Sequence, residues 1–255
     1  MKHSILYFLL SIILISCKEP IVAIGKTTGE TTVSNTADSI IKLSQDAHGV
    51  NVFDKNKFNL TFRNKEYSFD FTGKGFVFTR VDSTELGLIT DYYNDSIFWR
   101  SVNGEKIDLN SIDVAKFSSS INSVIYFATL PYKLSDAGVI SNYKGQQKIK
   151  SQNYDVVEIS FQEAGGGEDH QDIFYYWFNS KTHYLDYFAY QYETNGGGVR
   201  FREAINQVAV GGAVFQDYVN YEVPVGTHLS KIPNEYEMNS LTKLSLIENE
   251  LIRID

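Results

Sequence analysis

Apolar and polar residues alternate along most of the chain, and this period of two is the pattern that most limits its fold. Phe58, Leu60 and Phe62 fall on one face of an extended segment, because successive side chains of a β-strand point to opposite faces. The chain is therefore predicted to be mainly β (α+β), with a curved antiparallel sheet or half-barrel built as a meander of hairpins. Short polar turns separate the alternating segments, at 58–62, 67–71, 75–83, 94–103, 149–163, 172–179, 184–193, 199–207 and 214–223.

Two stretches depart from this alternation. Residues 37–48 carry apolar side chains near one helical face and end before a glycine, which predicts one amphipathic N-terminal helix. Its last residue, His48, is predicted to interact with the helix dipole rather than to bind a ligand. The segment 113–143 mixes helix-compatible and irregular sequence, so a helical insertion packed on the sheet is predicted there. A last alternating segment, 241–251, is predicted to be an edge strand.

The most aromatic part of the chain lies between two glycine triplets, at 165–167 and 196–198. Its first strand, DIFYYWF, is apolar on both faces and is therefore predicted to be central in the sheet and covered on both sides. The triplets lack the GxGxxG spacing of a dinucleotide site and the GKS or GKT of a P-loop. We predict that they form turns or bulges, where a side chain would clash.

Charge and motif spacing exclude several functions. The chain has 23 basic and 31 acidic residues, with a net charge of -8, so it lacks the basic field on which nucleic-acid binding depends. An acidic cluster with one imidazole, at 168–172, matches neither the spacing of an EF-hand loop nor HExxH. The sequence therefore predicts no metal site and no cofactor.

The first 17 residues, MKHSILYFLLSIILISC, combine a basic start with an apolar core that is too short to span a bilayer as a helix. The pattern is typical of an export leader, and we expect a lipoprotein signal peptide at 1–16. The end of this segment, LISC, resembles the lipobox of bacterial lipoproteins. The resemblance implies that Cys17 becomes the lipidated first residue of the mature protein. The alternatives are an ordinary cleaved leader and an uncleaved anchor.

Residues 17–36 are polar and rich in Thr and Gly, which predicts a flexible tether from Cys17. No linker or compositional break follows, so 37–255 is expected to be a single β-rich domain. The pair Lys18-Glu19 resembles the surface-export signal of Bacteroidetes lipoproteins, although with less acid than is usual. We therefore expect an exported protein, lipid-anchored in the bacterial envelope at the outer membrane, that faces either the periplasm or the cell surface.

Three residues are candidates for an enzymatic role. Glu203 and Asp217 fall on the apolar faces of successive strands, opposite or diagonal to each other in any even register. If both are buried, their proximity raises the pKa of one and makes an acid/base pair. The alternatives are a mutual hydrogen bond or salt bridges with neighbouring arginines. His170 borders the aromatic run, but no nucleophile and base signature accompanies it, so catalysis is not favoured.

Other residues are candidates for ligand binding. Arg200 and Arg202 share one face of their strand, and paired guanidinium groups suit carboxylate or phosphate recognition. Cross-strand pairing with acidic residues is the alternative. Large apolar side chains are ordinarily buried in a core, but they also form the walls of apolar pockets. The aromatic candidates are Tyr126 and Tyr132 of the insertion, and Trp177 and Tyr190 of the aromatic run.

The strings YDVVEISFQEAGGGEDHQDIFYYWFN, LDYFAYQYETNGGGVRFREAIN and VFQDYVNY resemble an uncharacterised lipoprotein family of Bacteroidetes, a domain of unknown function. NSVIYFATLPYKLSD fits the same pattern upstream, so the resemblance covers most of the mature domain. More distantly, a helix on a curved antiparallel sheet in an exported lipoprotein resembles the lipoprotein-carrier fold of localisation factors. Those carriers are half-barrels around an apolar cavity for acyl chains, and the resemblance implies a similar ligand here.

We therefore expect a non-enzymatic, lipid-anchored protein of the cell envelope whose curved sheet shelters an apolar or acyl ligand. One alternative is a hydrolase or lyase that acts on envelope material through His170, Glu203 or Asp217. A second is a surface interaction protein that binds another strand or a polysaccharide through exposed aromatic residues.

Overall fold

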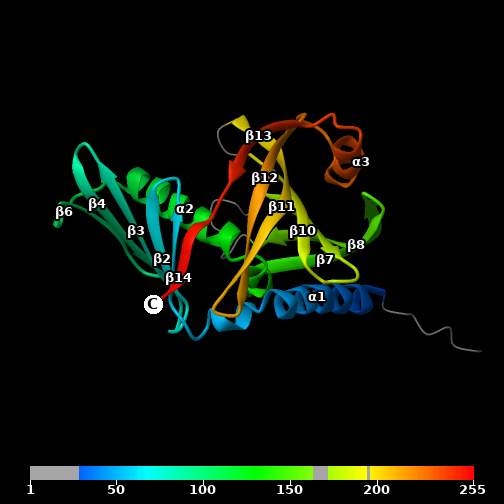
Figure 1. The fold of residues 1–255 in the computed structure, drawn as a ribbon, viewed down its shortest axis with the longest axis horizontal. Coiled ribbons are helices and arrows are strands. Elements are labelled where there is room, and N and C mark those ends of the chain that lie inside the picture. Colours follow the sequence, from blue (N-terminus) through cyan, green and yellow to red (C-terminus); the bar gives the residue numbers. More distant parts are fainter. Residues whose placement is uncertain (1–28, 163–171, 194–195) are drawn as a thin grey trace, which may run out of the picture.

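The protein is mainly β, and its strands form two antiparallel sheets (Figure 1). The computed structural model describes residues 29–162, 172–193 and 196–255. Sheet A has the order β14-β1-β2-β3-β4-β5-β6, and sheet B has the order β13-β12-β11-β10-β9-β8-β7. Sheet B follows the order of the chain throughout, and sheet A does so apart from the C-terminal strand β14 at its edge. The predicted meander of hairpins is therefore confirmed, and it is divided between two sheets.

The strands of sheet A are β1 (Phe58–Phe62), β2 (Lys65–Asp70), β3 (Val77–Thr84), β4 (Gly87–Asn94), β5 (Phe98–Val102), β6 (Glu105–Ile107) and β14 (Glu250–Ile254). Those of sheet B are β7 (Val139–Ile149), β8 (Gln152–Phe161), β9 (Ile173–Asn179), β10 (Leu185–Tyr192), β11 (Gly198–Val210), β12 (Ala213–Val223) and β13 (Thr242–Ile247).

The helices are α1 (Gly29–His48), α2 (Ser111–Ala128) and α3 (Ile232–Glu237), with short 3-10 turns at η1 (Val50–Val52), η2 (Tyr132–Ser135) and η5 (Leu229–Lys231). Helix α1 begins before the predicted residue 37. The predicted insertion contains most of α2 and all of η2, but its end already belongs to β7. The sequence reasoning did not predict α3, which has only six residues.

Sheet B is covered on both faces, with β9 near its centre. Trp177 packs on one face with Phe201 and with Tyr236 of α3. On the other face, Tyr176 packs with Phe188 and with Ile41 of α1. Because successive residues of a strand face opposite ways, an apolar run such as that of β9 fits a strand buried on both sides. The predicted central strand is therefore confirmed.

Two connections hold the sheets together. The far end of the β11–β12 hairpin extends beyond sheet B, and Phe215 packs there with Phe53, Phe58 and Phe69 in the core of sheet A. The C-terminal segment crosses from β13, at the edge of sheet B, to β14, at the edge of sheet A (Figure 1). The predicted edge strand at 241–251 is thus two edge strands, one in each sheet.

His48 ties the end of α1 to sheet B. It is fully buried, and its Nε2 accepts a hydrogen bond from the Leu185 backbone N–H at 3.1 Å. The ring proton therefore lies on Nδ1, which faces the Val214 carbonyl oxygen at 3.5 Å. Burial lowers the pKa of His48 to about 4, against a smaller opposite effect of the Val214 contact. The expected charged interaction with the helix dipole was wrong, because the imidazole is neutral at pH 7.

A buried ion-pair cluster fastens α2 to sheet A. Asp91 on β4 is 1% exposed and accepts hydrogen bonds from both neighbouring strands. Arg80 on β3 donates to it through Nε at 2.9 Å and Nη2 at 2.6 Å, and Arg100 on β5 donates through Nε at 2.6 Å. Each arginine also reaches α2. Arg80 donates to the Ser120 hydroxyl at 3.0 Å, and Arg100 lies 3.5 Å over the Phe117 ring.

The neutral state of His48 predicts a pH-dependent stability. Between pH 6.5 and about 4 the unfolded chain binds a proton at His48 that the folded chain does not, so stability falls as pH falls through this window. This difference between the pKa values of His48 in the unfolded and folded chain corresponds to a loss of about 3 kcal/mol in the free energy of unfolding. Urea unfolding from pH 7.5 to 4.5 should show a smaller pH slope for His48→Gln than for the wild type. His228→Gln, at an exposed site, should keep the wild-type slope. Equal slopes for His48→Gln and wild type would contradict the assignment.

The cluster at Asp91 predicts a large loss of stability on neutralisation. Asp91→Asn leaves two buried guanidinium groups without a counter-charge, and breaking a buried pair in this way costs about 3–5 kcal/mol. Glu66→Gln is the matched control, because its carboxylate is exposed and lies 3.9 Å from Arg253; it should change the unfolding free energy by less than about 1 kcal/mol. Chemical denaturation measures both. A loss at Asp91 as small as that at Glu66 would overturn this account.

Candidate functional site

Helix α2 lies between the two sheets (Figure 1). The Asn110 side chain caps its N-terminus by accepting a hydrogen bond from the Asp113 N–H at 2.9 Å. Ile121 and Ile125 belong to the core of sheet A, whereas Phe127 packs against the core of sheet B. A helix that is apolar on more than one face is typical of a buried position. It separates the sheets, and cavities remain beside it.

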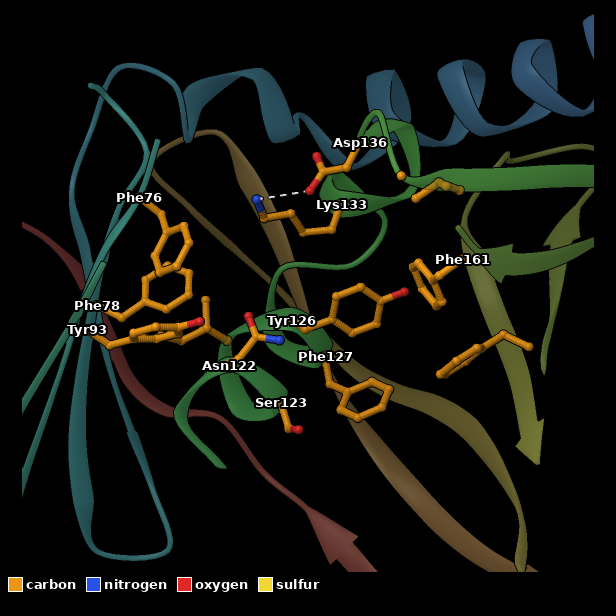
Figure 2. Close-up of a pocket in the computed structure, with 14 residues that line it drawn as sticks. Phe76, Phe78, Tyr93, Asn122, Ser123, Tyr126, Phe127, Lys133, Asp136 and Phe161 are labelled. Atoms are coloured by element: carbon orange, nitrogen blue, oxygen red, sulfur yellow. Dashed lines mark ion pairs between the residues drawn. The ribbon is translucent and has the colours of Figure 1, made fainter. Parts of the chain in front are cut away.

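The first cavity has a volume of about 330 Å³ and lies between the sheets beside α2 (Figure 2). Phe76, Phe78 and Tyr93 form its wall on sheet A, and Phe161 and Phe174 form its wall on sheet B. The α2 residues Asn122, Ser123, Tyr126 and Phe127 reach it from the helix. Lys133 and Asp136 also line it and form an ion pair at 3.2 Å.

A second cavity, of about 370 Å³, adjoins the first. Ser123, Phe127 and Phe174 line both, so the two share a wall made by α2 and β9. Away from this shared wall, the second cavity is lined by several polar residues: Arg63, Asp172, Arg200, Arg202, Asn220 and Asn249. Mostly apolar walls with a few polar groups, in volumes of this size, are usual for small-molecule sites.

A pair of hydroxyl groups joins α2 to sheet B beside the first cavity. Tyr126 and Tyr176 share a hydrogen bond between their hydroxyl oxygens at 3.0 Å. Burial, followed by the neighbouring Tyr126, raises the pKa of Tyr176 well above its ordinary value. Of these two residues, Tyr126 lines the first cavity.

Four of the six predicted ligand-binding residues meet at these cavities. Tyr126 lines the first, and Tyr190, Arg200 and Arg202 line the second. The other two lie elsewhere. Tyr132 packs against the core of sheet A and donates a hydrogen bond to Asp54. Trp177 is fully buried on the α3 face of sheet B, where its Nε1 donates to Gln147 Oε1 at 2.7 Å.

The two arginines have different partners. Arg200 lies opposite Glu222 in the β11–β12 register, with Nη1 3.9 Å from Oε1 of that carboxylate. This matches the cross-strand alternative, although at long range. Arg202 lies opposite Asn220 and donates from Nη2 to the Tyr190 hydroxyl at 3.0 Å.

Glu203 holds α3 and the β7–β8 turn on sheet B. It accepts hydrogen bonds from Lys150 Nζ at 3.0 Å and from the Tyr221 hydroxyl at 3.2 Å. Burial raises the pKa of Glu203, but hydrogen bonds from Tyr236, Lys150 and Tyr221 outweigh burial and leave the pKa below its ordinary value. An acid in this state serves as an acceptor and is ionised at pH 7.

Asp217 lies diagonally from Glu203, since Glu203 pairs with Val219 and Asp217 pairs with Ile205. It accepts hydrogen bonds from Asn206 Nδ2 at 3.2 Å and from the Asn249 backbone N–H at 2.8 Å. The two carboxylates therefore have separate partners, and neither lines the cavities beside α2.

Several predictions fall on parts of the chain outside the described residues. These are His170, the first glycine triplet, the signal peptide and Cys17. In the second triplet, a Cβ on Gly198 would come 2.5 Å from the Tyr192 hydroxyl, so a side chain would clash there as predicted. Within the described ranges, no three His, Cys, Asp or Glu side chains are grouped so that they could hold a metal ion. No helix in those ranges is long and apolar enough to cross a membrane.

The sequence reasoning did not assign the sheet A wall to the site. Phe76 and Phe78 were interpreted only as strand residues, and Tyr93 was assigned to no element. The local signal in β3 is mixed, because Arg80 shares the buried face of the strand with Phe78, so the sequence shows no clean apolar face that needs a cover. Nothing in the sequence says that α2 covers this strand, because the contact joins segments far apart in the chain.

The fold resembles solved structures of low sequence identity. A LolA superfamily protein from Nitrosomonas europaea has a TM-score of 0.50 at 7% identity, over 86% of this chain and 93% of that protein. A DUF1329 family protein from Desulfovibrio piger has a TM-score of 0.47 at 10% identity, with the same coverage of both chains. A putative outer membrane lipoprotein-sorting protein domain from Vibrio parahaemolyticus has a TM-score of 0.40 at 9% identity, over 80% of this chain and 98% of that domain. The first of these shows a similar fold, and the expected distant resemblance to the carrier fold is confirmed at that level.

No curated protein matches the sequence significantly. A family of unknown function, DUF6503, matches residues 2–249, nearly the whole chain. The expected resemblance to an uncharacterised family is thereby confirmed, and the chain belongs to the DUF6503 family.

Proposed function

We propose that this protein is a lipid-anchored component of the bacterial cell envelope that shelters an apolar or acyl ligand in the two cavities beside α2. The anchor is Cys17, and residues between it and α1 allow the domain to stand away from the membrane surface. Binding is non-enzymatic in this proposal. Outer-membrane attachment, facing either the periplasm or the cell surface, belongs to the same proposal and rests on the leader sequence alone.

The observation that carries the proposal is the pair of adjoining cavities with a common aromatic wall. Their volumes, about 330 and 370 Å³, fall within the range of small-molecule sites. Phe127 and Phe174 line both, so an elongated apolar molecule would contact the same rings along its length. Removal of an acyl chain from water is favourable by about 0.8 kcal/mol for each buried methylene. The similarity to a LolA superfamily protein supports the arrangement of sheet and helix, though not the ligand.

The alternatives have less support from the geometry. An envelope hydrolase or lyase using Glu203 and Asp217 would need these carboxylates at a common cavity, and each is held by other partners outside both cavities. A surface interaction protein would expose large aromatic side chains. Among the described residues, the exposed large hydrophobic side chains are those of Leu, Ile, Val and Met.

Ser123 gives a direct test, because its small side chain lines both cavities. Ser123→Trp places an indole in the space that the ligand needs and should weaken binding of palmitate at least tenfold. Lys116→Trp is the matched control, since Lys116 is an exposed residue of the same helix and should leave binding unchanged. Isothermal titration measures the affinity, and native mass spectrometry counts bound palmitate.

The wild type should bind palmitate with a stoichiometry of one or two chains. If Ser123→Trp is folded and binds palmitate as tightly as Lys116→Trp and the wild type, the cavities beside α2 are not the binding site. If the wild type does not bind palmitate and also carries no acyl compound when purified from membranes, the proposed function is wrong.

A further inference from the structure

Arg202 places a buried positive charge at the second cavity. The residue is 8% exposed, and the guanidinium group lies among three rings, 4.1 Å from Phe127, 5.3 Å from Phe188 and 5.4 Å from Tyr190. Its hydrogen bond to the Tyr190 hydroxyl uses Nη2. Ring faces attract a cation, but they do not replace the hydrogen bonds that water gave to its N–H groups.

No carboxylate in the described part of the chain neutralises this charge. Within the described ranges, Arg202 forms no ion pair, and its Nε is a buried donor without a hydrogen-bond partner. The other buried arginines differ, because Arg80 and Arg100 both bind the carboxylate of Asp91. Burying an unpaired charge is costly, so stability alone does not explain why Arg202 stays unpaired.

A second unsatisfied group lies directly across the strand pair. Asn220 is opposite Arg202 in the β11–β12 register, and its Oδ1 is buried without a partner. Its Nδ2 donates to the Ser245 hydroxyl at 3.3 Å. Both residues line the second cavity. Asn220 Oδ1 is an acceptor, so it marks unused hydrogen-bonding capacity beside Arg202 but would not itself bind an anion.

The charge of this lining is opposite to that of the whole chain. Among the described residues, three arginines, Arg63, Arg200 and Arg202, line the second cavity against one acidic residue, Asp172. The protein as a whole has a net charge of -8. A local excess of guanidinium groups in an acidic protein favours an anion at this position.

We propose that the second cavity binds an oxyanion, a carboxylate or phosphate group, through the guanidinium of Arg202. The guanidinium group belongs to the lining of this cavity and has no carboxylate partner among the described residues, and charge-assisted hydrogen bonds of this type are roughly twice as strong as neutral ones. Arg200 adds positive charge at the border of the cavity. Resting on the proposed function, the anion is the head group of an amphiphile, and its apolar chain lies along Phe127 and Phe174 into the first cavity.

The test compares molecules that share a chain or a charge. Decanoate and decanol have the same chain and differ in head-group charge, and inorganic phosphate has charge without a chain. Isothermal titration should show that the wild type binds decanoate about ten- to a hundredfold more tightly than decanol. Arg202→Met should bind both with affinities within about twofold of each other. Arg253→Met, at a half-exposed arginine of β14, should keep the wild-type preference.

The melting temperature of the ligand-free protein distinguishes a ligand-binding Arg202 from one that only stabilises the fold. Since Arg202→Met removes an unpaired buried charge and keeps an apolar stem, the ligand-free variant should melt no lower than the wild type. Arg202→Lys keeps the charge without the planar fork, so it should retain a reduced preference for decanoate. A variant that melts several degrees lower and still prefers decanoate would make Arg202 structural and overturn the inference.

The outcomes separate this inference from the proposed function. Equal binding of decanoate and decanol to the wild type would overturn the oxyanion site and leave the apolar cavity supported. Phosphate binding that depends on Arg202, without binding of either amphiphile, would support an oxyanion site for a free anion and contradict the proposed function. If no probe binds to the wild type, both are wrong.

Discussion

The burial of α2 between the two sheets is the constraint on which the rest of the structure depends. The helix is held on sheet A by the contacts of Arg80 and Arg100, which themselves converge on Asp91. On the other side, Phe127 stacks on Phe188 of sheet B with 5.6 Å between ring centroids. With one helix in contact with both sheets, neither sheet can close over the other. The space that remains beside the helix is the space in which we place a ligand.

Buried polar groups are handled in two different ways in this fold. His48 and Asp91 are fully satisfied, one as a neutral ring between two backbone groups and the other between two arginines. Such groups fix how elements pack, because a shift of either partner breaks several hydrogen bonds at once. Arg202 and Asn220 each keep one buried atom, Nε and Oδ1, without a hydrogen-bond partner. The satisfied groups stabilise the packing of the fold, whereas we propose that the unsatisfied group at Arg202 binds a ligand.

Local patterns predicted much of the fold because the physics behind them is local. The turn after Phe62 and the apolar faces on either side of it needed only the period of two, and β9 was placed at the centre because both its faces are apolar. The division into two sheets could not be predicted in this way. Strand pairing between β1 and β14 joins segments that lie far apart in the sequence, and no short window contains both.

The candidate site shows the same limit. Parity placed Arg200 and Arg202 on one face of β11, opposite Glu203, and the structure agrees. The alternation of side chains along a strand does not predict which element covers each face. The burial of Arg202 beneath Phe127 was therefore not predicted. Trp177 illustrates the reverse error: its strand was correctly predicted to be buried on both faces, but only the contacts with α3 show that this residue faces away from the cavities.

The central claim is that the space beside α2 holds an apolar chain with its charged end at Arg202. A crystal structure of the protein grown with decanoate tests this directly. The account predicts continuous elongated density along Phe127 and Phe174, with the carboxylate within hydrogen-bond distance of the Arg202 guanidinium. Density for water alone in both cavities, with decanoate bound elsewhere or absent under saturating conditions, would contradict it.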